Sequence, residues 1–426
     1  MTPTIPLDLI APIYNPATFT RPDEVDRIFE RLRREHPLAV ADVPGYDPHW
    51  IVTKYEDVRE ISRQDELFHS GDRSKMLVSQ AGEQLIRQFT GGSSNIFKML
   101  VHLDPPEHGK YRAVTGDMFK PQSIALLQEQ VRKTARHFVD DLAARAPACD
   151  FAADVAFFYP LRVICNVIGI PEEDHARMLR LTQWLFSYAD PELHRPGADP
   201  TDPLEHTLTW KMVYDEFNSY YSDVIEDRQR QPRADFATAV VNGRIDGQPM
   251  DHRAMVSYLV IASTAGHDTT SATTGMSMWV LAQRPDLLAQ LKADLSLVPA
   301  FIEESIRWTT PVKHFVRSAT TDYILRGQKI AKGDLLYLSY ISANRDEEIF
   351  TDPYSFRLDR KPNRHIGFGY GGHICLGQHL ARLEMKTFWE ELLPRLDSVE
   401  LDGEPKLAVA DLVCGPKSIP VRFRMQ

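Results

Sequence analysis

Residues 368–377 read Phe-Gly-Tyr-Gly-Gly-His-Ile-Cys-Leu-Gly and come directly before Gln378–Leu393, whose apolar spacing predicts a helix. Glycine adopts positive φ values and lets the backbone approach a large flat ligand closely. Cys375 stands just before that helix, where free N–H groups and the positive end of the helix dipole stabilise a thiolate. Cys375 is therefore a candidate thiolate ligand.

Two simpler interpretations compete with this one. Many buried cysteines are inert, so Cys375 by itself indicates little. Gly367, Gly369 and Gly372 also fit the dinucleotide-binding pattern G-x-G-x-x-G, but too little chain follows them to build a dinucleotide domain. We favour the ligand interpretation because the glycines, the cysteine and the helix start occur together.

A second unusual stretch, Ala265-Gly266-His267-Asp268-Thr269-Thr270, lies inside the mainly apolar segment Arg253–Gln283. A helix that is apolar on nearly every side runs through a core. Polar side chains there cost free energy unless they are hydrogen-bonded or used. A threonine hydroxyl bonded to a carbonyl one turn back can open the helix, and Gly266 leaves room for a small ligand such as dioxygen. A polar kink without any chemistry is the alternative.

The remaining pattern predicts a mainly α fold with small β-sheets. Strands are expected at Leu38–Val43 and Trp50–Thr53, as a hairpin, and at Leu335–Ser339. Residues 68–100 are expected to form a loop with short helices and residues 190–203 an irregular connection, and both are candidate lids. No linker or repeat divides the chain, so we expect one domain over residues 1–426. Further helices are predicted at Pro22–His36, Glu56–Ser62, Ile124–Ala144, Val155–Ile168, Asp174–Tyr188, Leu204–Arg230 and Pro299–Trp308.

Composition narrows the classes of function. A formal net charge of −10 makes the chain a poor general nucleic-acid binder. The 4 cysteines are far apart in the sequence, which indicates neither a zinc ribbon nor a disulfide framework and favours the reducing cytoplasm. No stretch reaches the roughly 20 apolar residues of a membrane span. We therefore expect a soluble, cytoplasmic protein without membrane or nucleic-acid partners.

The stretch around Cys375 resembles the cysteine loop of cytochromes P-450, whose pattern is Phe-x-x-Gly-x-x-x-Cys-x-Gly. Phe368, Gly371, Cys375 and Gly377 occupy its fixed positions. The resemblance runs from Pro22 to the C-terminus and is strongest to the soluble bacterial class, especially the α-terpineol hydroxylase branch. It implies a cytochrome P-450 fold with haem b (iron protoporphyrin IX) buried between the long central helix and the cysteine-loop helix. Cys375 would bind the iron, with Phe368, Gly369 and Gly377 beside the haem.

The resemblance also gives roles to the polar stretch of the long helix. Ala265 and Gly266 become part of an oxygen-binding groove beside the haem. Asp268 resembles the acid of a proton relay, and Thr269 resembles the alcohol that holds the iron-bound oxygen. Reduced dioxygen needs two protons before its O–O bond breaks, so some relay from solvent is chemically required.

Glu304-Ser305-Ile306-Arg307 matches the family's Glu-x-x-Arg motif, which pairs with a later arginine to lock the core behind the haem. Taken alone, such an i, i+3 pair is usually a surface ion pair of little energetic weight. Arg360 is the best match for the later arginine. Lys361 follows it, where family members often have an aromatic residue.

Four basic side chains match positions that hold the two haem propionates in similar enzymes, because cations and Arg forks suit carboxylates. For each taken singly, a solvated surface cation is the alternative. Their joint match favours the propionate role. The four are His108, Arg112, Arg317 and His373.

The implied activity inserts one oxygen atom of O2 into a C–H bond, while two electrons and two protons reduce the other atom to water. The candidate pocket is apolar, which predicts a small hydrophobic substrate: a monoterpene, another terpenoid or an alkyl-aromatic. The candidate pocket residues are Ile261, Ala262, Ala265, Val312, Phe315 and Val316.

No flavin or iron–sulfur signature appears, so we expect electrons from a two-iron ferredoxin and its reductase. Lys110, Arg112, Arg364 and Lys386 are candidates for a basic docking patch on a monomeric protein. A peroxide-driven peroxygenase or an isomerase is one alternative, a non-catalytic haem sensor a second, and a cofactor-free helical binding protein a third. The Asp268-Thr269 pair argues against the first two, which need no proton relay.

Overall fold

The computed structural model describes residues 2–199 and 201–426; Pro200, inside the segment expected to be irregular, lies outside them. The helices of eight or more residues are α2 (Pro22–Glu35), α3 (Tyr55–Arg63), α4 (Gln80–Thr90), α5 (Glu107–Gly116), α7 (Gln128–Ala144), α8 (Phe158–Ile168), α9 (His175–Phe186), α10 (Pro203–Arg230), α12 (His252–Gln283), α13 (Pro285–Ala293), α14 (Val298–Thr309) and α16 (Gln378–Leu392). The shorter ones are α1 (Leu7–Ile10), α6 (Pro121–Ala125), α11 (Phe236–Val241) and α15 (Tyr340–Ala343).

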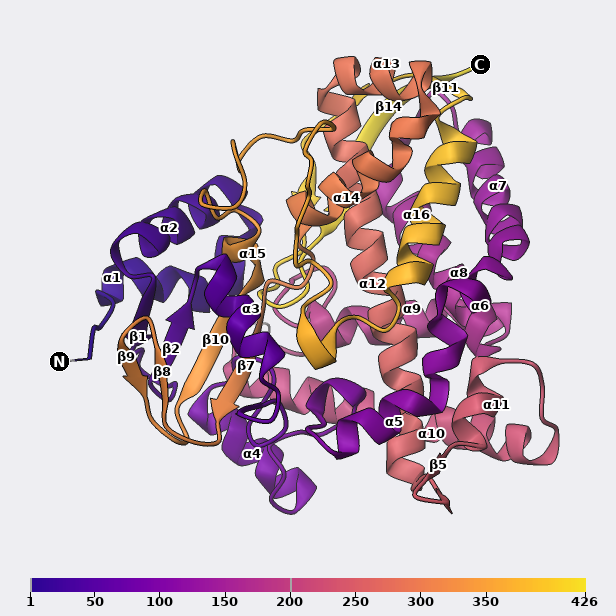
Figure 1. Cartoon of the computed structure of the whole chain (residues 1–426). Helices are drawn as coiled ribbons and strands as arrows, with labels where there is room; N and C mark the ends of the chain where they lie inside the picture. The colour runs from indigo at the N-terminus through magenta and orange to yellow at the C-terminus, as the bar shows by residue number, and fades with distance from the viewer. Residues whose placement is uncertain (1, 200) are drawn as a thin grey trace.

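A five-stranded sheet in the order β1-β2-β10-β7-β3 lies beside the helical part, together with α1 and α2 (Figure 1). Its strands are β1 (Leu38–Ala41), β2 (His49–Val52), β10 (Leu335–Ser339), β7 (His314–Ala319) and β3 (Phe68–His69). The β1–β2 hairpin confirms the predicted one, with Leu38 opposite Val52. A three-stranded sheet of β11 (Leu396–Leu401), β14 (Pro420–Met425) and β4 (Ala148–Asp150) completes the larger sheets. The mainly α class with small sheets is confirmed.

Helix α12 runs through the middle of the helical part, as its apolar composition predicts (Figure 1). Its 32 residues span about 48 Å. Asp251 caps the first turn by accepting a hydrogen bond from Ala254 N, and Pro285 follows the end of the helix. A Cβ atom on Gly266 would lie only 2.8 Å from Cγ1 of Ile164 in α8. The missing side chain thus allows close packing of α12 on α8, whereas the sequence suggested a space for dioxygen.

One predicted helix is divided in the structure, one helix was not predicted, and the short helices expected within residues 68–100 include one of three turns. The expected helix at Ile124–Ala144 is divided into α6 and α7. The break cannot be seen in the sequence, because the buried residues keep helical spacing across it. Helix α13 begins at Pro285, immediately after α12, because proline suits the first position of a helix. Segment 68–100 contains the 11-residue α4, capped by Ser79 and ended by Gly91 at φ +69°. Only short apolar periodicity marks this helix in the sequence.

The second candidate lid, residues 190–203, is tied down at its start. Asp190 is 0% exposed, and its carboxylate accepts hydrogen bonds from Lys417 Nζ at 3.0 Å and from Val409 N at 2.8 Å. Tyr188 donates to Asp411 at 2.8 Å beside it. Closure of either segment over a substrate stays a prediction.

Buried charge pairs join α14 to the segment before the cysteine loop. Glu304 accepts hydrogen bonds from Arg307 Nη2 at 2.7 Å and from Arg360 Nε at 3.1 Å. Arg307 Nη1 also donates to the carbonyl oxygens of Asn344 at 3.0 Å and Pro353 at 2.9 Å. The structure therefore brings the Glu-x-x-Arg residues and Arg360 into one hydrogen-bonded cluster, which holds the long connection to the cysteine loop in place.

Replacing Glu304 with Gln should lower the free energy of unfolding by about 3–5 kcal/mol, because Arg307 and Arg360 would keep their charges without a buried anion. Urea denaturation followed by circular dichroism measures this loss. Asp402→Asn is the matched control, since it breaks an exposed pair with Arg422 and should leave stability nearly unchanged. Equal losses in the two variants would contradict the buried-cluster account.

Candidate functional site

A central cavity lies between α12 and the cysteine loop, residues 368–377, and holds about 1500 Å³ of empty space, open solvent included. Cys375 faces it from the loop, Ala265 and Thr269 from α12, and Phe315 and Arg317 from β7. Every cofactor-binding residue proposed from the sequence lines it: His108, Arg112, Ala265, Gly266, Arg317, Phe368, Gly369, His373, Cys375 and Gly377. Segments far apart in the sequence therefore meet around one space.

The glycines of the loop bring Cys375 to this position. A Cβ atom on Gly371, at φ +73°, would lie 1.9 Å from the carbonyl oxygen of Ser62 in α3, and one on Gly372 would lie 2.2 Å from Oδ2 of Asp65. Only glycine allows the loop to pack this closely on the end of α3. The Cys375 amide donates to Phe368 O at 2.8 Å, which closes the loop ahead of α16.

Burial raises the pKa of the Cys375 thiol, while backbone N–H groups of Gly377 and Gln378 and the charges of Arg112 and Arg382 act in the opposite direction. The N–H groups at the start of α16 and the nearby arginines thus favour the thiolate over the thiol. A metal ion bound to the sulfur would lower the pKa of the thiol further, because a metal binds cysteine as the thiolate. The geometry suits a metal ligand at the cavity wall.

Two arginines in the central cavity carry buried charge without a protein anion. Arg317 is 2% exposed and Arg112 is half-buried, and burial lowers the pKa of each. Within residues 2–199 and 201–426, neither guanidinium has a carboxylate within ion-pairing distance, and Nε of Arg317 has no hydrogen-bond partner. Buried cations are normally paired. The cavity therefore calls for an anionic ligand.

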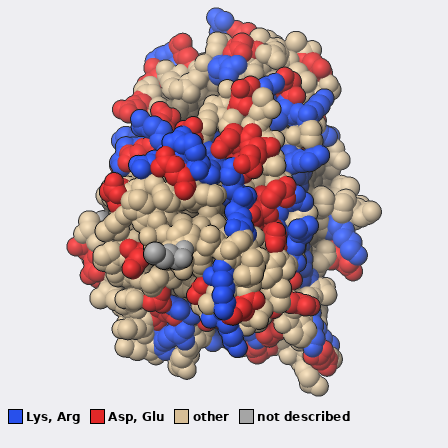
Figure 2. Space-filling model, turned by 60° about the vertical axis from the view of Figure 1, so that its left-hand side comes forward, with Lys and Arg blue, Asp and Glu red and all other residues tan. Residues whose placement is uncertain are grey.

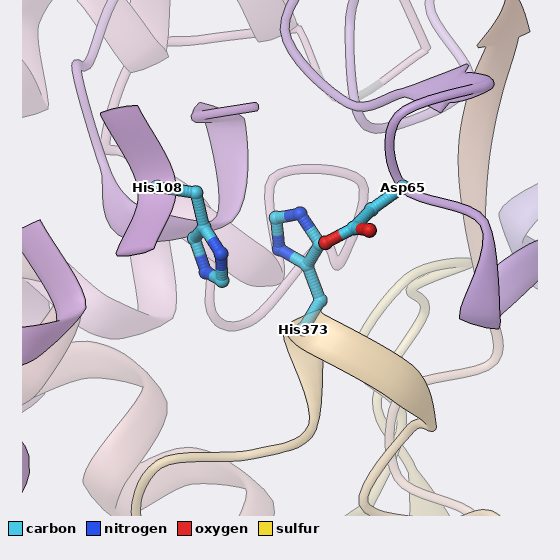
Figure 3. Close-up of side chains that lie close together, drawn as sticks. All are labelled: Asp65, His108 and His373. Atoms are coloured by element: carbon cyan, nitrogen blue, oxygen red, sulfur yellow. The ribbon is translucent and has the colours of Figure 1, made fainter. Parts of the chain in front are cut away.

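Two histidines and an aspartate lie beside these arginines (Figure 3). The His108 and His373 rings stack with centroids 4.0 Å apart, and Asp65 approaches His373 from the other side. Burial and the charge of Arg317 lower the pKa of His373 to about 2, and burial lowers that of His108. Both rings are thus neutral and can each donate one N–H group to a carboxylate. Buried Nε2 of His108 has no partner among the described residues.

Sequence reasoning missed three polar residues around the central cavity. Lys75 is 1% exposed, lines the cavity and donates to Ser70 Oγ at 2.9 Å. Glu384 of α16 also lines it, and burial raises the pKa of this carboxyl well above its usual value. Asp65 supports Gly372 and His373. Lys75 and Asp65 lie in or next to segments without apolar periodicity, so the sequence does not mark them. Glu384 lies in the helix that follows the cysteine loop, and that position could have identified it as a residue of the site.

The polar stretch of α12 divides between two faces of the helix. Thr269 lines the central cavity and its Oγ1 donates to Ala265 O at 3.0 Å. Asp268 lies on another face, near Cys414, and does not line that cavity. Burial raises the pKa of Asp268 to about 7. The acid and the alcohol are therefore adjacent in sequence but open onto different surroundings.

A side cavity, of about 900 Å³ with open solvent included, adjoins the central cavity beside α12. Ile261, Ala265, Thr269, Val312 and Phe315 line both spaces, so the two share a wall. Ala262 lines the central cavity. Val316 lines neither, so its expected pocket role is wrong. Successive side chains of β7 point to opposite faces, which places Phe315 and Arg317 in the cavity and Val316 behind the sheet.

The residues present fit haem. Two propionates would satisfy the unpaired charges of Arg112 and Arg317 and the free Nε2 of His108. Cys375 would supply a sulfur ligand for the iron from the cysteine loop, which faces the same cavity as Thr269 of α12. The cavity wall between these groups is largely apolar, as a porphyrin ring requires, with Leu100, Ile164, Phe236, Phe368 and Leu380 among its members.

Replacing Arg317 with Leu should speed loss of haem about 10- to 100-fold, because one charge-assisted hydrogen bond to a propionate disappears. The haem-free polypeptide should be no less stable, because the variant removes a buried unpaired cation. Transfer of haem to an excess of apomyoglobin measures the first effect and urea denaturation the second. Lys329→Gln, at an exposed site, is the control. Unchanged haem loss would contradict a propionate role.

Comparisons with known proteins agree with this site. A family model described as Cytochrome P450 matches residues 11–423. The chain is 41% identical to Cytochrome P450-terp of Pseudomonas sp over 420 residues, covering 99% of this chain and 98% of that protein. It is 32% identical to the methyl-branched lipid omega-hydroxylase of Mycobacterium tuberculosis over 411 residues, covering 94% and 91%.

Solved structures of similar proteins share the whole fold. CYP108D1 from Novosphingobium aromaticivorans superposes with a TM-score of 0.91 at 38% identity, covering 100% of both chains. Cytochrome P450 CYP268A2 of Mycobacterium marinum, in complex with pseudoionone, gives a TM-score of 0.87 at 28% identity, covering 99% of this chain and 100% of that one. The cysteine loop, the two arginines without a protein anion and these matches agree with one another. The chain belongs to the cytochrome P450 family, as a monooxygenase that binds haem b.

Proposed function

We propose that this monooxygenase inserts one oxygen atom of O2 into a C–H bond of a small terpenoid or alkyl-aromatic molecule, with electrons from a two-iron ferredoxin and its reductase. The observation that carries the substrate class is the apolar wall shared by the central and side cavities, built from Ile261, Ala265, Val312 and Phe315. The M. marinum relative was solved in complex with pseudoionone. One domain over residues 1–426 is part of this proposal, because each of the three buried apolar clusters joins residues that are far apart in the chain.

The chain's own side chains divide the work in this proposal. When bound, haem supplies the activation of O2. Cys375 Sγ holds its iron, and His108, Arg112, Arg317 and His373 hold its propionates. Ile261 and Phe315 exclude water and position the substrate, while Ala265 leaves space beside the porphyrin. No helix in the described part of the chain combines the length and apolarity of a membrane span.

Proton supply falls to Asp268 and Thr269. Thr269 Oγ1 opens onto the central cavity and can pass a proton toward it, while its bond to Ala265 O fixes its direction. Asp268 lies on another face of α12, so in this proposal its proton reaches that hydroxyl through solvent rather than by direct contact. Its pKa of about 7 lets the carboxyl gain and lose a proton near neutral pH. The Cys414 thiol beside it, with a pKa raised by burial to about 12, stays neutral.

The rate of product formation should fall as the pH rises through about 7, because Asp268 is a neutral donor below its raised pKa and an ionised acceptor above it. Asp268→Asn cannot titrate, so it should lose this dependence and slow product formation about 100-fold or more. Product per electron pair consumed is the measurement, with hydrogen peroxide counted. Thr269→Ala should release more peroxide at the expense of product. A peroxide-driven peroxygenase would instead show neither effect.

The proposed docking surface for ferredoxin changes in one respect. Arg112 lines the central cavity, so it does not belong to the surface patch. Arg364 is exposed, Lys386 lies on α16 at 3.5 Å from Glu390, and Lys110 pairs with Asp246. On the face in Figure 2, basic and acidic side chains are interleaved. The candidate patch therefore keeps Lys110, Arg364 and Lys386, of which Lys110 and Lys386 lie next to acidic side chains.

Reversing charge with Arg364→Glu and Lys386→Glu together should slow electron transfer from an acidic two-iron ferredoxin about 10-fold at low ionic strength. The dependence of the rate on salt should also become weaker. Stopped-flow reduction of the ferric protein measures both. Lys329→Glu, on the hairpin of β8 (Tyr323–Leu325) and β9 (Gln328–Ile330), is the matched control. Equal slowing by the control would rule out a local patch.

A further inference from the structure

Two segments that are distant in the sequence form much of the side-cavity wall. Leu185 and Phe186, at the end of α9, line it from one segment, and Leu412 and Val413 line it from the other. Leu412 and Val413 belong to the C-terminal hairpin, residues 406–418, in the connection between its two strands. These strands are β12 (Lys406–Leu407) and β13 (Pro416–Ser418). The position of this hairpin relative to α9 therefore sets the shape of the side cavity.

Asp190 joins these two segments. Its Oδ2 accepts hydrogen bonds from Val409 N at 2.8 Å and from Lys417 Nζ at 3.0 Å, so it contacts the hairpin on both sides of the turn. Its Oδ1 accepts hydrogen bonds from Glu192 N at 2.9 Å and from Leu193 N at 3.1 Å, in the connection between α9 and α10. One buried carboxylate thus binds donors from the hairpin and from its own connection.

The ammonium group of Lys417 requires this partner. Its side chain is 8% exposed, and Nζ lies 3.0 Å from each carboxylate oxygen of Asp190. Glu192, which is largely exposed, lies 3.3 Å from the same ammonium. A buried cation without an anion is costly, so the pair keeps β13 on the connection that follows α9. Asp190 lines neither cavity, and it can act on a bound molecule only through the segments that it joins.

Tyr188 makes a second link, two residues before Asp190. Its hydroxyl donates to Asp411 Oδ1 at 2.8 Å, and Asp411 directly precedes Leu412 in the hairpin. Its ring packs edge to face with Trp210 of α10, with centroids 5.7 Å apart, and Trp210 itself lines the side cavity. The two links therefore connect the end of α9, the start of α10 and the hairpin around one wall.

We propose that Asp190 is a positioning residue of this monooxygenase: it holds the C-terminal hairpin on the α9–α10 connection, so that Leu412 and Val413 move with this connection as one wall of the side cavity. The carboxylate does so through its bonds to Val409 N, to Lys417 Nζ and to the amides of the connection itself. Opening of the connection therefore widens the side cavity at the same time. The inference concerns the shape of the wall, so it does not depend on the substrate class or the electron donor proposed above.

Hydrogen exchange tests whether the two segments are coupled. Lys417→Met alters the hairpin alone and leaves Asp190 with its backbone donors. In the holoenzyme, the amides of residues 192–193 should exchange about 10-fold faster, as expected for the loss of one charge-assisted hydrogen bond, and mass spectrometry measures this. Lys406→Met, the same substitution at an exposed position of β12, is the matched control and should exchange as wild type. Unchanged exchange at residues 192–193 in Lys417→Met would overturn the coupling, whatever happens in the hairpin.

Release of ligands bound to the haem iron tests whether Asp190 shapes the cavity. The probes are imidazole, phenylimidazole and clotrimazole, which share an imidazole ring and increase in size, and stopped-flow spectroscopy gives their dissociation rates. Asp190→Asn keeps the size of the side chain but turns one acceptor into a donor, so it cannot bind both segments. It should leave the release of imidazole unchanged and speed that of clotrimazole about 10-fold, because the loosened wall contacts only the larger probes.

Two results of this experiment would overturn the positioning role: an acceleration that is absent, and one that is equal for all three probes. A reduced carbonyl spectrum that changes in Asp190→Asn would place the effect at the Cys375 loop and would overturn it as well. Lys417→Met should affect the probes in the same order, and it replaces Asp190→Asn if that variant does not fold. Lys406→Met is again the matched control and should release every probe as wild type does.

Discussion

The position of one sulfur atom governs the arrangement of this protein. Cys375 stands at the start of α16, and its loop is pressed onto the end of α3 so closely that Gly371 has no room for a side chain. The central cavity lies between that loop and α12, so Thr269, the arginines without a protein anion and the apolar wall all face the same space as the sulfur. A shift of the loop would misplace every one of them.

Buried charge is handled in two different ways on either side of this loop. Behind it, Glu304, Arg307 and Arg360 neutralise one another within the protein. Beside the central cavity, Arg112 and Arg317 have no protein anion, and burial lowers the pKa of both. The first cluster contributes to the stability of the polypeptide, while the second contributes only when an anionic ligand is present. In the function proposed above, separate sets of arginines would serve folding and cofactor binding.

Helix α12 is mainly apolar yet carries two polar side chains, Asp268 and Thr269, with different roles, because its faces contact different parts of the protein. Thr269 opens onto the central cavity, whereas Asp268 is enclosed near Cys414, and enclosure without a nearby cation raises its pKa to about 7.

The sequence by itself determined the features that depend on local chemistry and spacing. These are the family, the cysteine ligand, the long apolar helix, the β1–β2 hairpin and the residues of the Glu-x-x-Arg motif, each marked by a pattern within a short stretch. Only the tertiary structure decided which side chains share a space. It placed Val316 behind the sheet, Arg112 at the cavity wall and Ile164 against Gly266, and it brought Lys75 and Glu384 to the central cavity. The physical reason is that burial, pairing and strand face depend on segments distant in sequence, about which a local pattern contains no information.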